Sequence, residues 1–351
     1  LGSEYPQIVV LGFWLRSASV KSFISDFLSN TPNQCMPFPK GMAFHLPPQN
    51  VDTMFVYSWA ISFLVGNANI VRLPSQLNPL SEWIIKEIVN ILEDNNEGNK
   101  NFFCNYPLDS QFSDSLSLAC DVRIIWGGDQ KIKNISKAPL KPTASNINFP
   151  DRQSFCIIDS LSYEASDENT KQSIAEKLFN DIFWFDQMGC SSPKAIVFLG
   201  KINKKIDFYN RLVEVAEIKE KLPQSSTVIS KFVNANEISG KGISKNSYSI
   251  KNILDISETN LSKDVFEYFH GGGSIFHFEI KNLDQISALL SDKTQTLTYF
   301  GLREEDKKKI VEIMSQYGGF RLVNIGDALS FDTVWDGIDI FSGMSKLIKV
   351  E

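Results

Sequence analysis

Cys190 stands in a sequence context that suits a nucleophile. It follows Gly189 within the polar segment 186–193, which reads DQMGCSSP. An amphipathic pattern over 167–185 predicts a helix before this segment, and the apolar run 194–199 predicts a strand after it. At such a glycine turn, backbone N–H groups can point at a reacting atom, and a thiolate becomes an effective nucleophile. The more common alternative, a small buried apolar cysteine, stays open on these residues alone.

Asn50 is a second candidate because its amide lies between a predicted strand at 41–46 and a predicted apolar helix at 51–65. An amide at the beginning of a helix commonly caps it, and Asp52 and Thr53 are further capping candidates. The same amide could instead donate a hydrogen bond to a developing oxyanion. The residues alone support both interpretations.

Two short segments could contact a phosphate. Arg72 follows a predicted buried strand at 68–73, where a guanidinium binds either a phosphate or simply solvent. Gly127 and Gly128 follow a predicted strand at 121–126 and look like half of a phosphate-binding loop. Two glycines without the full G-x-G-x-x-G pattern are a weak signal.

The composition limits the class of protein. With 351 residues, 43% of them hydrophobic and 22% charged, the chain is long enough for about two globular domains and is not disordered. A net charge of −6 lacks the basic footprint of a nucleic-acid binder. The 26 phenylalanines suit large apolar cores or an apolar ligand site.

Neither a metal site nor a disulfide framework is expected from the cysteines and histidines. The five cysteines are widely spaced without a C-x-x-C pair, and the three histidines have no metal-ligand spacing. The longest apolar runs fall short of the roughly 20 residues that span a bilayer, and no signal sequence is visible. We therefore expect a cytoplasmic protein without a membrane span.

The order of predicted strands and helices favours an α/β protein with parallel sheets. Beyond 194–199, the pattern continues with helices near 284–290 and 304–316 and with strands near 317–325 and 339–350. Three stretches are expected to lie outside regular elements. The segment 35–40 is read as loop, 93–113 as a polar insertion, and 137–148 as a loop that crosses between domains.

Six blocks in order along the chain resemble the aldehyde dehydrogenase superfamily and, more narrowly, the bacterial long-chain acyl-CoA reductases of the LuxC type, which supply fatty aldehyde in bioluminescence. The resemblance runs from about Tyr5 to the C-terminus. The blocks are HLPPQN at 45–50, GNANIVRLPS at 66–75, WGGD at 126–129, DQMGCSSP at 186–193, QTLTYFG at 295–301 and WDG at 335–337.

The resemblance implies a role for each matching residue. Cys190 matches the nucleophile, and Asn50 matches the side-chain donor of the oxyanion hole, which acts beside the nucleophile's own N–H. Arg72 stands where the superfamily usually has a lysine that contacts the adenosine ribose, and Ser75 lies where a 2′-phosphate would be sensed. Gly127 and Gly128 match the loop that lies against the dinucleotide.

The resemblance also implies the fold and the domains: an aldehyde dehydrogenase-like protein with two Rossmann-like parallel-sheet domains. Residues 1–148 would bind the nicotinamide cofactor, with a shortened N-terminus and an insertion near 93–113. Residues 149–330 would form the catalytic domain that carries Cys190. Residues 331–351 would form a strand that returns to the first domain or to an oligomer interface.

The implied reaction is the NADPH-dependent reduction of a fatty acyl thioester to an aldehyde through an acyl-cysteine, with CoA as the leaving group. The implied partners are fatty acyl-CoA or an acyl-protein thioester, an acyl-transferring protein and further copies in a homo-oligomer. Two alternatives remain: a CoA-acylating or semialdehyde-type dehydrogenase of the same fold, and a non-catalytic scaffold of a reductase complex.

Two departures from the family pattern matter. Ordinary aldehyde dehydrogenases have a glutamate in a Glu-Leu-Gly-Gly-Lys block that activates the deacylating water, whereas the stretch 148–154 here reads NFPDRQS. Loss of that base fits a reductase or acyl transferase, because hydrolysis would waste the acyl-enzyme. Asp151 is the nearest carboxylate and is expected to be structural. The chain is also shorter than expected, and His270, beside three glycines, is expected to be solvated.

Overall fold

The computed structural model describes residues 5–48, 51–107 and 111–351 of the chain. The chain forms two compact units. Unit 1 comprises Leu1–Asp151 and Phe331–Glu351, and unit 2 comprises Arg152–Ser330. The chain therefore leaves unit 1 after Asp151 and returns to it after Ser330.

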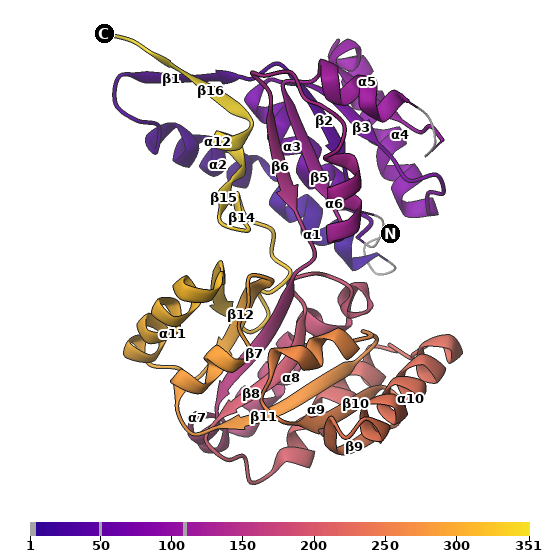
Figure 1. Cartoon of the computed structure of the whole chain (residues 1–351), viewed down its shortest axis with the longest axis vertical. Coiled ribbons are helices and arrows are strands. Elements are labelled where there is room, and N and C mark those ends of the chain that lie inside the picture. The colour runs from indigo at the N-terminus through magenta and orange to yellow at the C-terminus, as the bar shows by residue number, and fades with distance from the viewer. Residues whose placement is uncertain (1–4, 49–50, 108–110) are drawn as a thin grey trace. The chain divides into compact units, whose positions relative to one another are not determined.

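Unit 1 is built on a five-stranded parallel sheet with the order β4-β3-β2-β5-β6. Each parallel connection needs a crossover, and one helix supplies it in each case (Figure 1). The strands are β2 (Met42–Leu46), β3 (Ala68–Arg72), β4 (Asn101–Cys104), β5 (Val122–Trp126) and β6 (Ser145–Phe149). The crossover helices are α3 (Met54–Val65), α4 (Pro79–Asp94), α5 (Phe112–Ala119) and α6 (Asp129–Ile135). The predicted α/β alternation is confirmed here.

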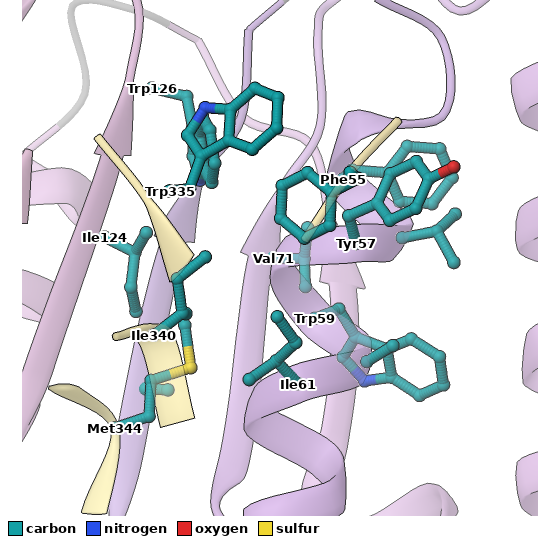
Figure 2. Packing of buried hydrophobic residues seen from close by; sticks show 14 of the residues in the cluster. Phe55, Tyr57, Trp59, Ile61, Val71, Ile124, Trp126, Trp335, Ile340 and Met344 are labelled. Atoms are coloured by element: carbon teal, nitrogen blue, oxygen red, sulfur yellow. The ribbon is translucent and has the colours of Figure 1, made fainter. Parts of the chain in front are cut away.

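The central strands β2 and β5 bury side chains on both faces of this sheet, which explains their continuous apolar runs. On β5, Ile124 joins the large core that contains α3, whereas Ile125 packs on the opposite face with partly buried side chains of α5 and α6. The C-terminal segment belongs to the first of these cores. Figure 2 shows Trp335, Ile340 and Met344 among the buried side chains of the cluster that also holds Ile124.

The segment 35–40, predicted as loop, is instead a strand. β1 (Cys35–Pro39) pairs antiparallel with β16 (Ser345–Lys349), and the two lie side by side in Figure 1. Two further backbone hydrogen bonds flank this pair of strands: the Val350 N–H donates to the Gln34 carbonyl, and the Lys40 N–H donates to the Met344 carbonyl. The hydrogen-bonded positions along 34–40 are therefore the even-numbered ones. Pro37 and Pro39 alternate with those positions, so their missing N–H groups cost no ladder bond. Because β16 lies about 300 residues further along the chain, no residue near β1 in the sequence indicates this pairing.

The other two stretches predicted as irregular also contain sheet strands. β4 lies within 93–113, where the helix α5 also begins, and β6 begins at Ser145 within the predicted crossover loop. Both strands are at the edges of the sheet and need only one ladder and a partial apolar face. On β6, for example, Ile147 and Phe149 are buried while their neighbours are not. Such short, partly buried strands lack the continuous apolar run that identified β2 and β5.

Unit 2 holds a seven-stranded sheet with the order β13-β12-β7-β8-β11-β10-β9, parallel except for the edge strand β9. One face packs on α8 and α9, and the other packs on α10, α11 and two 3₁₀ helices. The strands are β7 (Gln153–Asp159), β8 (Pro193–Leu199), β9 (Ser244–Ile250), β10 (Leu254–Thr259), β11 (Ser274–Ile280), β12 (Thr294–Phe300) and β13 (Arg321–Asn324). The helices are α7 (Ser160–Ala165), α8 (Glu168–Phe183), α9 (Lys205–Ile218), α10 (Ser225–Gly240), α11 (Glu304–Tyr317), η3 (Lys263–Tyr268) and η4 (Leu283–Ala288).

Further elements outside the five-stranded sheet complete unit 1. They are α1 (Pro6–Trp14), α2 (Ser17–Ser29), η1 (Gly98–Lys100), β14 (Val334–Trp335), β15 (Ile338–Asp339) and α12 (Ile340–Gly343). Within the described ranges, no single helix has both the length and the apolar composition to cross a membrane, and only the bent pair Gln7–Trp14 and Ser17–Ser29 passes that test jointly, by length and composition.

Candidate active site

Cys190 lies at the entrance to β8, three residues before the strand begins at Pro193. It is partly exposed, and the 3₁₀ helix η2 (Trp184–Gln187) precedes it at the end of α8. The Ser192 N–H donates to the Gly189 carbonyl at 3.0 Å, which closes a turn around the cysteine. The predicted arrangement of helix, glycine turn and strand is therefore present.

A buried hydroxyl ties the backbone of Cys190 to the centre of the sheet. Ser154 on β7 is fully buried, and its Oγ donates to the Cys190 carbonyl at 2.8 Å. The same oxygen accepts from the Thr296 N–H of β12 at 3.1 Å. Three chain segments thus meet at one hydroxyl. The position of the cysteine backbone is set by rigid strands rather than by its own loop.

Gln187 anchors the segment immediately before the cysteine. Its side chain is 1% exposed and makes four hydrogen bonds to backbone groups. The Nε2 group donates to the carbonyls of Pro193 and Ser274 at 2.8 and 2.9 Å, and Oε1 accepts from the N–H groups of Gly273 and Ser274 at 3.0 and 3.1 Å. The two carbonyls that accept from Nε2 belong to the first residues of β8 and β11, so the amide joins both strand ends to the cysteine loop.

The backbone before Cys190 is strained, and a glycine loop makes room for it. Phe185, Asp186 and Gln187 all have left-handed backbone angles, with φ of 53°, 51° and 64°. The Gly272 N–H donates to the Asp186 carbonyl at 2.9 Å, and a Cβ at Gly271 would come within 2.9 Å of the Met188 sulfur. The three glycines after His270 therefore let a loop approach the cysteine segment closely, a role that their sequence alone did not reveal.

Gln187→Ala is expected to lower the free energy of unfolding by about 3–5 kcal/mol, because it leaves several buried backbone groups without partners. Urea denaturation of the variant and of wild type measures the difference. Gln172→Ala is the matched control, since that amide bonds Glu176 on the exposed side of α8. A loss below about 1 kcal/mol for Gln187→Ala would show that water replaces the amide and that Gln187 does not hold the loop.

A second buried group shapes the other side of the turn. The Asp181 carboxylate on α8 is fully buried and accepts from the N–H groups of Gly326 and Ala328 at 2.8 and 3.0 Å. Burial raises the pKa of Asp181 to about 7, against the effect of these two bonds. The segment held in this way packs on the cysteine turn, since a Cβ at Gly189 would come within 3.0 Å of Leu329. Gly189 thus makes room for Leu329.

Three of the other four cysteines are poor candidates for a thiolate. Burial raises the pKa of the Cys104 thiol, raises that of Cys120 to about 11, and raises that of Cys156 well above its usual range. Cys35 belongs to the β1–β16 ribbon. A nucleophile must be deprotonated and accessible, so Cys190 is the strongest candidate of the five.

The histidines offer no obvious acid or base. His45 is fully buried, with its ring nitrogens 2.8 Å from Ser58 Oγ and 3.1 Å from Asn69 Oδ1. Burial lowers the pKa of His45 and of His277 to about 4 in each case. His270 is exposed, as expected for a solvated residue. Asp151 is also exposed, between β6 and β7.

Arg72 ends β3 at the carboxyl edge of the unit 1 sheet. Its guanidinium lies over the Tyr106 ring, 4.8 Å from the centroid, and its Nε is buried without a hydrogen-bond partner among the described residues. A buried guanidinium donor without a partner fits a site that binds an anion. Ser75 is exposed in the loop that follows. These features fit the phosphates of a dinucleotide.

Gly127 and Gly128 follow β5 at the same edge. Gly127 has a φ of 149°, and a Cβ there would come within 2.7 Å of Lys131 Cδ, so the position requires glycine. Gly128 is exposed and is the N-cap residue of α6. Lys131, which the sequence interpretation did not single out, is thus the side chain that covers the loop. The sequence signal that could have identified Lys131 was its position as the third residue of the helix that follows the glycines.

Asn50 lies outside the described residues, so its proposed role stays a prediction. The segments on either side are in place: β2 ends at Leu46, and α3 begins at Met54. The predicted cap Thr53 makes no side-chain capping bond to α3.

Comparison with known protein families gives one family match. Residues 18–264 match the family model described as acyl-CoA reductase (LuxC). A long-chain acyl-protein thioester reductase of Aliivibrio fischeri is 24% identical over 186 residues. That alignment spans 50% of this chain and only 37% of the relative.

Solved structures show the same fold at low identity. Aldehyde dehydrogenase 21 of Physcomitrella patens, solved with succinate, matches with a TM-score of 0.66 and 15% identity, over 90% of this chain and 69% of that chain. The glyceraldehyde-3-phosphate dehydrogenase of Methanocaldococcus jannaschii, solved with NADP, matches with a TM-score of 0.62 and 14% identity, over 90% and 73%. The predicted aldehyde dehydrogenase-like fold is confirmed.

Proposed function

The chain belongs to the acyl-CoA reductase (LuxC) family, and on this premise we propose that it reduces a long-chain acyl thioester to an aldehyde, with Cys190 as nucleophile and NADPH as reductant. The observation that carries the proposal is the partly exposed Cys190 at a turn that Ser154 and Gln187 fix to four strands of one sheet, β7, β8, β11 and β12. A rigidly held nucleophile suits covalent catalysis, because the thiol is already positioned for attack when the substrate binds.

In the first half-reaction, the Cys190 thiolate attacks the thioester carbonyl and forms a tetrahedral oxyanion. The Cys190 N–H and the Asn50 amide donate hydrogen bonds to that oxygen. When the intermediate collapses, the carbon–sulfur bond to CoA breaks and CoA leaves as a thiolate. The acyl group is then held as a thioester on Cys190. An acyl-protein thioester, the substrate class in the name of the Aliivibrio fischeri relative, would react in the same way.

In the second half-reaction the acyl carbon is reduced. NADPH, when bound, supplies a hydride to that carbon, and the same two donors hold the oxyanion of the resulting thiohemiacetal. Breakage of the bond to Cys190 then releases the aldehyde and restores the thiolate. The stretch 148–154 contains no glutamate and its Asp151 is exposed, so this stretch offers no buried base that would direct water onto the acyl-enzyme.

The residues of unit 1 fit the role of holding the cofactor. Arg72 presents a buried guanidinium donor at the carboxyl edge of β3, and Gly127 allows close approach at the end of β5. Ligands of open α/β sheets bind at this edge. We also propose that residues 1–148 form the cofactor domain and 149–330 the catalytic domain, and that the protein acts as a homo-oligomer.

A product assay tests this function. Wild-type protein incubated with fatty acyl-CoA and NADPH should release CoA and aldehyde in equal amounts. An oxidative semialdehyde dehydrogenase would instead turn over short semialdehydes with NAD, and a non-catalytic scaffold would yield neither product. Either result would contradict the proposed reaction.

Arg72→Ala is expected to weaken NADP binding about ten- to a hundred-fold, because the guanidinium makes a charge-assisted contact with the 2′-phosphate. NAD binding should change less, since NAD lacks that phosphate. The sequence from Val71 to Leu80 contains no acidic residue that would repel it. Isothermal titration with both cofactors is the measurement, and Arg16→Ala, an exposed arginine of the same unit, is the control. Equal weakening of both cofactors would contradict a 2′-phosphate contact and restrict Arg72 to a group that NAD and NADP share, namely the pyrophosphate, the ribose or the adenine.

A further inference from the structure

Lys131 on α6 is held at the carboxyl edge of the unit 1 sheet by main-chain carbonyls. Its Nζ donates to the carbonyls of Pro47 and Trp126, both at 2.9 Å. Pro47 directly follows β2, and Trp126 ends β5. The alkyl chain lies against Gly127, where a Cβ would come within 2.7 Å of Cδ. The ammonium group has three N–H donors, so one remains after these two bonds.

The pKa of Lys131 is influenced by burial and by a second cation, Arg72. Burial is the larger cause that lowers the pKa of Lys131 to about 8, and the positive charge of Arg72 on β3 lowers it further. No carboxylate among the described residues counteracts either effect. Two partly buried like charges repel each other, and a bound anion would remove the free-energy cost of that repulsion.

We infer that Lys131 and Arg72 together bind a phosphate group of the dinucleotide. The inference deepens the proposed function and rests on its cofactor. Each side chain brings a donor with no protein partner among the described residues: the third ammonium N–H of Lys131 and the buried Nε of Arg72. The phosphate belongs either to the pyrophosphate, which NAD and NADP share, or to the 2′-phosphate of NADP.

Lys131→Met tests the inference, because methionine keeps an unbranched apolar chain against Gly127 and removes the charge. Lys133→Met is the matched control, since Lys133 lies on the same helix and is exposed. We expect Lys131→Met to weaken dinucleotide binding about ten- to a hundred-fold, measured by isothermal titration at pH 7. Weakening of NADP alone identifies the 2′-phosphate, and equal weakening of NAD and NADP identifies the pyrophosphate.

The pH dependence of binding is a second readout. Phosphate binding favours the charged ammonium, so affinity is full below the pKa of about 8 and falls as the pH rises above it. We expect the NADP dissociation constant to rise about tenfold between pH 7 and 9 in wild type and to stay nearly constant in Lys131→Met. The titratable groups around the pair are Arg72 on β3, Cys104 and Tyr106, which interact with Arg72, and Asp129 and Lys133 on α6 itself. Retention of the full pH dependence in Lys131→Met would assign it to one of these groups and overturn the role of Lys131.

Three other results would also overturn the inference. They are unchanged affinity of Lys131→Met for both dinucleotides, an equal loss in Lys133→Met, and weakened binding of CoA alone. Acylation of Cys190 by acyl-CoA in the absence of cofactor separates this inference from the proposed function. Normal acylation with unchanged dinucleotide binding in Lys131→Met refutes the inference alone. Absent acylation with Lys131-dependent dinucleotide binding refutes the proposed reaction and leaves the inference standing.

Discussion

Cys190→Ala is expected to abolish the covalent acyl adduct that wild-type protein forms with fatty acyl-CoA, and to reduce aldehyde production to background. The alanine removes the only group that can carry the acyl chain in the proposed mechanism. The fold should survive, because the variant keeps the Cys190 carbonyl and the Gln187 amide, whose hydrogen bonds hold this turn. Intact-protein mass spectrometry measures the adduct, and thermal melting measures the fold.

The control for this result replaces the other cysteines. Cys35, Cys104, Cys120 and Cys156 together changed to alanine should leave the adduct in place. The burial of Cys120 and Cys156 makes some loss of stability expected, so adduct is counted per folded molecule. An adduct that survives in Cys190→Ala and maps to another cysteine would refute the assignment.

Asn50→Ala is expected to lower the rates of acylation and reduction about 10²–10³-fold, because one side-chain donor to the oxyanion is lost. Cofactor affinity should change little. Single-turnover kinetics with acyl-CoA measures the acylation step directly, and thermal melting of the same variant reports on its stability.

A cap at the beginning of α3 would give a different pattern from an oxyanion donor. In that case Asn50→Ala would lower the melting temperature while each folded molecule kept nearly normal turnover. Thr53→Ala is a useful control, because Thr53 is buried before α3 but makes no capping bond with its side chain. Similar kinetic losses in both variants would point to displacement of the helix rather than to loss of a donor.

Much of the central architecture was predictable because the inner strands are buried on both faces. β2, β5, β7 and β8 appear in the sequence as apolar runs, and α8 appears through its periodic apolar face. The edge strands β4 and β6 were missed because they are short and only partly buried. β1 was missed because its partner β16 is at the other end of the chain, and its prolines suggested a loop.

The candidate site was only partly predictable for a similar reason. Cys190 and Arg72 were identified because residue type and local order carry the signal. Ser154 and Gln187 position the cysteine through contacts with strands that are distant in sequence, so no local pattern marks them. Lys131 was missed because its role depends on packing over Gly127 and on the charge of Arg72.

The central claim is that an acyl group on Cys190 is the species reduced to aldehyde, and a two-step measurement tests it most directly. The protein is first incubated with fatty acyl-CoA without cofactor, freed of excess substrate, and mapped by peptide mass spectrometry. NADPH is then added, and the adduct and products are followed over time. The account predicts that the acyl group is on the peptide containing Cys190 and disappears as an equal amount of aldehyde forms. Release of fatty acid in place of aldehyde, or an adduct that NADPH leaves unchanged, would contradict it.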